Sequence, residues 1–346
     1  MIDVAVIGGG PAGLAAAILA RQRNLSVRVF EPRPGIIDKA CGEGLMPPAR
    51  KMLADLGVAE PPGMPFRGIR YIDRGHAVEA AFSKGPGLGV RRTELHKALR
   101  TRAEALGIEI VEHRVTEWEH DEEGVTVSGQ RYRWMVAADG LQSPIRRKLA
   151  LDVSPRFPPR LGVRRHFRVA PWADVVEVHW SEHAEAYVTP VSADEVGVAI
   201  LYNADADAPV SGDPFARWLS AFPELEERLG APCSDVRGAG PFERRSRVPQ
   251  VGRILLVGDA SGYLDPLTGE GIRLGLDTAL AAIDAIERGE PDRYRRSWAR
   301  VTRTYWWLTG GLLWVRHRPW LRRRLVRWLK RWPRGFRLAI DALNWA

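Results

Sequence analysis

The sequence has few groups that could form disulfides or bind a metal ion. Only Cys41 and Cys233 occur among 346 residues, and neither belongs to a CxxC pair or to a His/Cys cluster with ligand spacing. This pattern excludes a disulfide framework and a structural zinc site, and we expect no bound metal. Such sparse cysteine is typical of a reducing compartment, so we expect a cytoplasmic protein.

Other signatures are missing as well. No Ser/His/Asp order, pair of carboxylates or HExxH motif stands out, so the sequence identifies no catalytic side chain. No basic leader with an apolar region precedes the first apolar run, and we expect no secretory signal. The 11-residue apolar run 305–315 is well short of the roughly 20 residues that span a bilayer.

Positive charge is concentrated near the C-terminus. The net charge is +9, yet residues 293–337 contain 15 Lys and Arg and no Asp or Glu, while residues 1–292 contain 36 basic and 41 acidic residues. Eight of the 13 tryptophans also lie between Trp298 and Trp345. The body, with 45 % apolar residues in the whole chain, can form a large core, and the basic tail is a local feature.

Two glycine-rich segments lie far apart in the chain. The first contains Gly8, Gly10, Ala12 and Gly13 between an apolar run and an alanine-rich stretch, which indicates a strand, a tight turn and a helix that binds a pyrophosphate at its N-terminus. Glu31 ends the next apolar run, where its carboxylate can accept hydrogen bonds from an adenosine ribose.

The second segment follows the apolar run 253–257. It includes Gly258-Asp259 and then Pro266-Leu267-Thr268-Gly269-Glu270-Gly271-Ile272. We interpret Asp259 as an acceptor for hydroxyl groups of a ligand. Gly269 and Gly271 allow close approach of backbone N–H groups, and the helix that starts near Ile272 directs its positive end to the same place.

Together with the segment Asp139-Gly140 to Arg146, these motifs resemble FAD-dependent oxidoreductases of the superfamily that contains class A aromatic hydroxylases and geranylgeranyl reductases. The resemblance covers about residues 1–285. It implies that FAD is the cofactor, with Arg92 near its phosphate or ribityl part and Val115 near its adenine. The loop with Cys41, Gly42 and Gly44 resembles the Cys-Gly loop that contacts the flavin in prenyl reductases, although a mobile loop is the alternative. The expected cofactor-binding residues are Gly8, Gly10, Ala12, Gly13, Glu31, Cys41, Gly42, Gly44, Arg92, Val115, Asp259, Pro266, Gly269, Gly271 and Ile272.

The expected fold is α/β with α+β elements: a Rossmann-like FAD-binding domain, an inserted antiparallel-sheet substrate domain and C-terminal helices. FAD-binding parts are expected over 1–65, 91–159 and 251–290, substrate-domain strands over 66–90 and 160–250, and a basic, Trp-rich helical tail over 291–346. We also expect one helix over 215–229 and a turn over 85–89.

The substrate candidates are His179, Tyr187 and Thr189, which belong with His166 and Trp180 to the strands expected to face the flavin. A surface or core role is the alternative for each His. The flavin itself carries the redox chemistry in such enzymes, so the protein has to supply orientation and exclusion of water.

The resemblance implies an oxidoreductase that acts on a hydrophobic small molecule. We favour an NAD(P)H-dependent monooxygenase that hydroxylates an aromatic or polyketide-like substrate, with NAD(P)H as electron donor. Gly262 stands where hydroxylases commonly have a histidine, which favours the alternative, a geranylgeranyl reductase-like enzyme that saturates prenyl double bonds. The aromatic-Trp-aromatic motif that precedes a proline in the reductases is represented here only by Ala186-Tyr187-Val188-Thr189-Pro190. A non-catalytic, membrane-associated flavin-binding protein is a third hypothesis.

The tail has the pattern of a helix that lies in a membrane surface. Leu321, Leu325, Trp328 and Leu329 recur at helical spacing, and arginines occupy the other faces. We expect residues 293–337 to dock on the inner face of the membrane. The alternative is packing on the enzyme itself, and we expect no nucleic-acid partner. The oligomeric state stays open.

Overall fold

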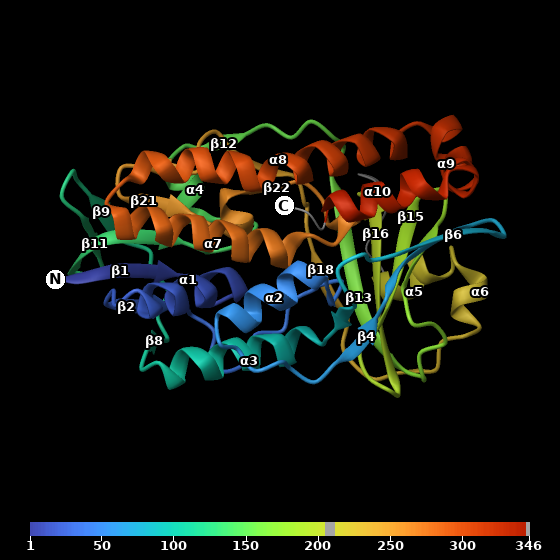
Figure 1. The fold of residues 1–346 in the computed structure, drawn as a ribbon, viewed down its shortest axis with the longest axis horizontal. Coiled ribbons are helices and arrows are strands. Elements are labelled where there is room, and N and C mark those ends of the chain that lie inside the picture. The colour runs from blue at the N-terminus through green and yellow to red at the C-terminus, as the bar shows by residue number, and fades with distance from the viewer. Residues whose placement is uncertain (205–211, 344–346) are drawn as a thin grey trace.

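The computed structural model describes residues 1–204 and 212–343. A mixed sheet lies at one end of the molecule and a larger, mainly antiparallel sheet at the other, with helices along both (Figure 1). The strands of the first sheet are β1 (Ile2–Ile7), β2 (Val27–Phe30), β8 (Glu109–Val111), β9 (Trp118–His120), β10 (Val125–Val127), β11 (Gln130–Ala137), β20 (Gln250–Val251) and β21 (Ile254–Leu256).

Parallel pairing at the centre of the first sheet places the ends of distant strands at one edge. The order β21-β11-β1-β2-β8 is parallel throughout, with Ile7 beside both Ala137 and Phe30. Strand β21 and the C-terminal halves of β1 and β11 are continuous buried apolar runs, as expected for strands covered on both faces. The turns that follow β1 and β21 therefore lie close together, although about 250 residues separate them.

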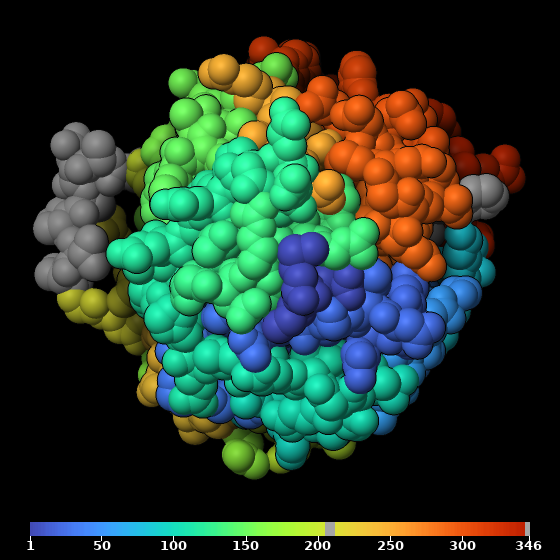
Figure 2. Space-filling view, turned by 90° about the vertical axis from the view of Figure 1, so that its left-hand side faces the viewer, coloured from blue at the N-terminus to red at the C-terminus, as the bar shows by residue number. Residues whose placement is uncertain are grey.

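Helices α1 (Pro11–Gln22), α3 (Arg92–Ala105) and α7 (Gly271–Arg288) form one layer beside this sheet. Residues 15–18 and 20 of α1 are fully buried, because small alanines let α7 approach it closely. Figure 2 shows the result at the surface, where the C-terminal third (orange) lies directly beside the N-terminal segment (blue). Helix α2 (Pro47–Asp55) also packs against α7.

The second sheet has the order β17-β13-β16-β15-β14-β5-β6, with β18 beside β13. Only β14 and β5 pair in parallel there. Its strands are β5 (Gly68–Asp73), β6 (His76–Ala81), β13 (Arg160–Arg168), β14 (Val176–Trp180), β15 (Ala184–Pro190), β16 (Glu195–Asn203), β17 (Ala231–Pro232) and β18 (Arg237–Ala239). One face packs on α5 (Pro214–Leu219) and α6 (Pro223–Glu226). We call the other the inner face, and it packs on Met46, on the segment 263–267 and on the C-terminal helices.

The described residues also form two three-stranded sheets. One contains β3 (Gly44–Leu45), β4 (Met64–Phe66) and β7 (Gly87–Gly89), and the other contains β12 (Asp152–Val153), β19 (Arg244–Ser246) and β22 (Gly262–Tyr263). A short α4 (Pro144–Lys148) follows β11, and single 3-10 turns cover Gly258–Ser261 and Pro266–Thr268.

The basic tail forms α8 (Pro291–Arg316), α9 (Pro319–Arg331) and α10 (Pro333–Leu343). Each helix has proline in its first turn, where the missing N–H costs nothing. Helices α9 and α10 pack on β6, and α8 runs along α7 (Figure 1). None of the helices in the described part of the chain is long and apolar enough to cross a membrane.

The structure confirms the mixed α/β fold class, with several sheets and C-terminal helices. The exact domain boundaries stay a prediction.

Two local expectations were wrong. The helix expected over 215–229 is divided into α5 and α6, because Phe222 precedes Pro223 and the residue before a proline avoids the helical region. The turn expected over 85–89 contains the short strand β7, whose glycines pair with Gly44 and Met64.

Tyr305 of α8 fixes the tail to the segment that follows β22. Its hydroxyl accepts hydrogen bonds from the N–H groups of Leu264 and Asp265, each at 3.0 Å, and it donates to the carbonyl of Asp265. All of these groups are buried. Because Tyr305→Phe leaves them without this partner, we expect it to lower the free energy of unfolding by about 1–3 kcal/mol, as measured by urea denaturation.

The matched control is Tyr202→Phe. Tyr202 is half-buried and stacks on Trp218, and within the described residues its hydroxyl forms no hydrogen bond. We expect it to change the free energy of unfolding by less than about 0.5 kcal/mol. Equal losses in the two variants would contradict the role given to the Tyr305 hydroxyl.

Candidate cofactor site

The phosphate end of the candidate site is the turn between β1 and α1. A Cβ atom on Gly13 would lie 1.8 Å from the carbonyl oxygen of Gly8, and Gly8 itself has φ +111°, so neither position admits a side chain. A Cβ on Gly10, by contrast, would meet no protein atom within 4 Å. No side chain caps the N-terminus of α1, so its N–H groups face this open space, as a phosphate requires.

Glu31 is held rigidly beside this turn. Its carboxylate accepts hydrogen bonds from the N–H of Gly9 at 2.8 Å and from the backbone and guanidinium of Arg33. Burial opposes ionisation of this carboxyl, but Arg33 and Gly9 outweigh it and hold the pKa of Glu31 below its usual value. The carboxylate is therefore charged and oriented, as a ribose acceptor must be.

Three cations gather around the space between the two glycine segments. Lys39 lies within electrostatic range of Arg33, Arg92, Glu31 and Asp259. Burial lowers the pKa of Lys39 and of Arg92, and the buried Nη1 atom of Arg92 has no hydrogen-bond partner in the described residues. The Glu31 carboxylate is already hydrogen-bonded to Gly9 and Arg33 and does not neutralise Lys39 and Arg92 as well. This group of cations can therefore accommodate an anionic ligand.

The two glycine segments meet directly. A Cβ on Gly258 would lie 3.0 Å from the Cβ of Ala12, and Gly275 of α7 approaches Ala12 almost as closely. The Gly258 N–H donates to Thr278 Oγ1 at 2.9 Å, which ties the turn to α7. Burial raises the pKa of Asp259, while Lys39 and Arg92 act to lower it.

The second segment continues into the N-terminus of α7. Asp265 Oδ1 accepts from the N–H of Leu267, Pro266 begins a 3-10 turn, and Gly269 has φ +73°, a conformation that favours glycine. Helix α7 begins at Gly271 and Ile272 with no side-chain cap. Burial raises the pKa of Glu270 to about 7, against the opposing effect of Arg273.

The Cys41–Gly44 loop is held by hydrogen bonds to three other elements, and Glu43 makes most of them. Within that loop the Glu43 N–H donates to Cys41 Sγ at 3.3 Å. Glu43 is buried and has φ +59°, unusual for a residue with a side chain. Its Oε1 accepts from the Arg92 N–H at 2.8 Å, and its Oε2 lies 2.6 Å from His166 Nε2 on β13. Arg164, also on β13, bonds to Asp38 and to the Lys39 carbonyl just before the loop.

Strand β15 forms hydrogen bonds with the Cys41–Gly44 loop and with the second glycine segment. Thr189 Oγ1 donates to the Gly42 carbonyl at 2.8 Å, and the Tyr187 hydroxyl donates to the Leu267 carbonyl at 2.9 Å. Burial raises the pKa of Tyr187 well above its usual value, so the hydroxyl keeps its proton and acts as a donor. Two of the three substrate candidates thus lie where the inner face of the second sheet meets the candidate site.

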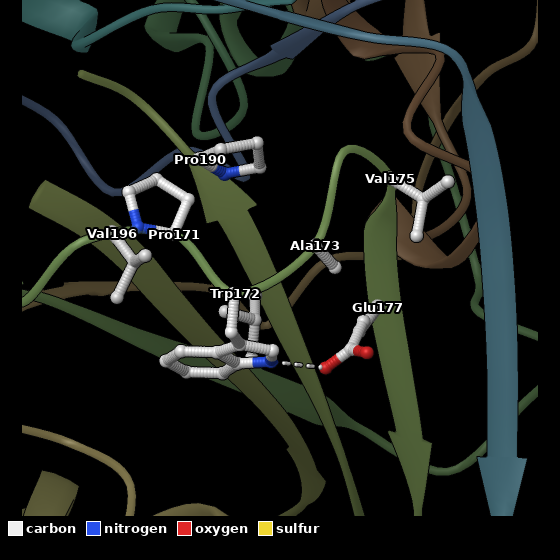
Figure 3. A pocket seen from close by; sticks show the side chains of 8 residues that line it. Pro171, Trp172, Ala173, Val175, Glu177, Pro190 and Val196 are labelled. Carbon is white, nitrogen blue, oxygen red and sulfur yellow. Dashed lines mark hydrogen bonds between the residues drawn. The ribbon is translucent and has the colours of Figure 1, made fainter. Parts of the chain in front are cut away.

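His179 lies on the opposite face of the sheet. It pairs with Ala186, and its Nε2 lies 3.2 Å from Glu177 Oε2. Glu177 also accepts from Trp172 Nε1 at the small pocket shown in Figure 3, which β14 and β15 separate from Tyr187 and Thr189. The structure therefore does not bring His179 close to Tyr187 and Thr189. Trp180 and His166, by contrast, lie on the inner face with Tyr187 and Thr189.

Arg146 links the Asp139–Arg146 segment to the second glycine segment. Its guanidinium donates to the carbonyls of Leu141, Asp259 and Ala260 and pairs with Asp152. This arrangement is structural.

Asp139 has no such set of partners. Burial raises its pKa, and its Oδ1 atom has no hydrogen-bond partner among the described residues. Val115 follows β8 and packs on the core, and its contact to adenine stays a prediction.

These observations fit FAD, a molecule with an anionic pyrophosphate between an adenosine and a flavin ring. Open space lies over Gly10 and Gly42, two helix N-termini lack side-chain caps, and Arg92 Nη1 and Asp139 Oδ1 are buried without partners. The model of the FAD binding domain family matches residues 1–287. The chain belongs to this family. It is an FAD-dependent oxidoreductase of the aromatic-hydroxylase-like superfamily.

Two similar proteins show the range of this flavoprotein superfamily. The chain is 28 % identical to the menaquinone reductase of Mycobacterium tuberculosis, over 87 % of this chain and 82 % of that protein. It is 25 % identical to the rifampicin monooxygenase of Streptomyces venezuelae, over 90 % of this chain and 67 % of that protein. A flavoprotein/dehydrogenase from Cytophaga hutchinsonii has the same fold, with a TM-score of 0.80 at 19 % identity and coverage of 94 % and 92 %.

The structure brings most of the predicted cofactor-binding segments together, but the sequence analysis did not include the residues that hold them in place. Glu43 was visible between Gly42 and Gly44 and was not chosen, and Arg164 and His166 act on that loop from β13. Arg33 could have been suspected, because it lies two residues after Glu31. Lys39 has no sequence pattern that marks it.

Gly10→Ala tests the phosphate end of this FAD-binding protein. The new methyl group would meet no protein atom, and φ −73° suits alanine, so we expect unchanged stability. A bound phosphate would lose its place, and we expect FAD affinity to fall about tenfold or more, roughly 1.4 kcal/mol, by fluorescence titration. The control is Gly311→Ala in α8, also in open space, which should leave FAD affinity unchanged. Full FAD affinity in Gly10→Ala would refute this placement.

Glu43→Ala tests the clamp on the Cys41–Gly44 loop. It removes the acceptor for Arg92 N–H and the partner of buried His166, so we expect the free energy of unfolding to fall by about 3 kcal/mol and FAD to bind more weakly. The control is Glu60→Ala, which breaks an exposed pair with Arg50 and should cost less than about 1 kcal/mol. The same small loss in both variants, by urea unfolding, would show that Glu43 does not hold the loop.

Proposed function

We propose that this flavoprotein reduces a carbon–carbon double bond in a hydrophobic, lipid-like substrate. The observation that carries the proposal is the clamped Cys41–Gly44 loop, which resembles the Cys-Gly loop of prenyl reductases. The hydrogen bonds of Glu43 and Thr189 hold this loop in place, which supports a contact with the flavin over the alternative of a mobile loop. This reverses the preference for hydroxylation drawn from the sequence.

When bound and reduced, FAD would supply a hydride to one carbon of the double bond, and the other carbon would take up a proton from the solvent. The chain's own residues bind and orient. Tyr187 and Thr189 fix the second glycine segment and the Cys41–Gly44 loop relative to the second sheet. Apolar side chains pack on the same face of that sheet. The similarity to a menaquinone reductase supports a substrate with an isoprenoid chain.

Hydroxylation of an aromatic substrate is the second candidate. It is favoured by the departure at Tyr187-Val188-Thr189-Pro190 from the reductases' strand motif, and by the similarity to a rifampicin monooxygenase. For this reaction we propose NAD(P)H as electron donor. A reductase could take electrons from NAD(P)H bound transiently at the flavin or from an external donor.

A polyprenyl phenol and its analogue with a saturated chain separate the two reactions. We expect the dithionite-reduced protein, without oxygen, to be reoxidised by the unsaturated compound alone, because only that chain accepts a hydride. The measurements are the flavin absorbance and the mass of the product, which should gain a pair of hydrogen atoms.

Ring hydroxylation with NADPH in air, with the chain unchanged, would overturn the reductase proposal and establish the second candidate. Equal reoxidation by both compounds would also contradict saturation of the chain. Hydrogen peroxide released with NADPH in air but without substrate would point to the oxygenase side.

A further inference from the structure

The tail has an inner side that packs on the enzyme. Besides the bonds of Tyr305, Thr309 Oγ1 lies 2.9 Å from Thr268 Oγ1 in the second glycine segment. Phe336 of α10 packs on Tyr71 of the second sheet, and Leu313 and Val326 join the same core. The packing alternative considered for the tail is therefore realised, and it occupies only one side of these helices.

The outer side exposes large apolar side chains. In the described residues, the large hydrophobic side chains that are exposed, apart from Met1 and Ile36, all belong to the tail. They are Trp307, Trp314, Trp320, Trp328, Trp332 and Leu338. Trp307 is 78 % exposed, which is unusual for so large an aromatic side chain. Exposed apolar side chains grouped in this way mark an interaction surface.

Exposed arginines lie on the same helices as these tryptophans. Arg296, Arg300, Arg303, Trp307 and Trp314 recur on one exposed stripe of α8 at intervals of three, four or seven residues. On α9 the exposed residues around Trp328 include Arg324, Arg327 and Arg331, which form no ion pair within the described residues. The surface thus combines free positive charge with aromatic rings.

This combination matches an anionic lipid bilayer. Tryptophan prefers the headgroup region, and arginine binds lipid phosphates while its stem lies among apolar groups. Helices α8 to α10 lie along the protein and do not have to cross the bilayer. A nucleic acid would also attract arginine, but it offers no apolar layer for Leu338 and five exposed tryptophans.

We propose that the outer side of α8, α9 and α10 docks the enzyme on a bilayer that contains anionic lipids. Docking places the second sheet and the second glycine segment directly behind the membrane contact, since the inner side of the same helices packs on them. A lipid-like substrate could then pass from the bilayer to the site without entering water. The inference does not depend on which reaction the flavin carries out.

Co-sedimentation of the full-length, FAD-loaded protein with vesicles tests this inference. The vesicles contain phosphatidylcholine alone or phosphatidylcholine with phosphatidylglycerol. One variant combines W307S, W314S and W328S, and another combines R324E, R327E and R331E. The charge control combines K51E, K97E and R147E, three exposed cations outside the tail.

We expect the wild-type protein and the control to bind vesicles that contain phosphatidylglycerol. We expect each tail variant to bind these vesicles at least about tenfold more weakly. We also expect an unchanged flavin spectrum in all variants. The blue shift of tryptophan fluorescence on binding should be smaller in the tryptophan variant. Equal binding of all variants, or no binding by the wild-type protein, would overturn the proposal. Tail-dependent binding of DNA or RNA without binding of vesicles would overturn it as well.

Discussion

The close packing of α1 against α7 is the constraint on which the site depends. Ala12, Gly258 and Gly275 bring the two helices and the turn after β21 together, and larger side chains at the glycines would push them apart. Parallel pairing of β1 and β21 with β11 between them delivers both turns to the same edge of the sheet. Two segments from opposite ends of the chain thereby meet at one candidate FAD site.

The second sheet acts on this site through a few buried polar contacts. Glu43 joins the Cys41–Gly44 loop to His166 and to the first turn of α3, while Thr189 and Tyr187 hold the two loops from β15. A buried carboxylate is costly unless it is fully paired. The structure places such a pair at the junction of the two halves, which fixes their relative position.

Local motifs could be predicted from the sequence because their meaning lies within a few residues. The glycine fingerprint, Glu31 and the start of α7 follow from turn and helix chemistry, and the division at Pro223 could have been predicted too. The pairing of Glu43 with His166 joins residues 123 apart in sequence, and no local pattern indicates it. The sequence could not predict on which face of the second sheet His179 lies. Both faces of β14 are largely buried, so its side chains show no alternation of buried and exposed residues that would distinguish the two faces.

The central claim is that one FAD extends from the first glycine segment to the second. A crystal structure of the protein with FAD tests it most directly. The account predicts the pyrophosphate at the N-terminus of α1 near Gly10 and Arg92, and the flavin ring at the N-terminus of α7 beside the Cys41–Gly44 loop. A flavin ring bound away from Gly269 to Gly271, or a pyrophosphate away from Gly10, would contradict it.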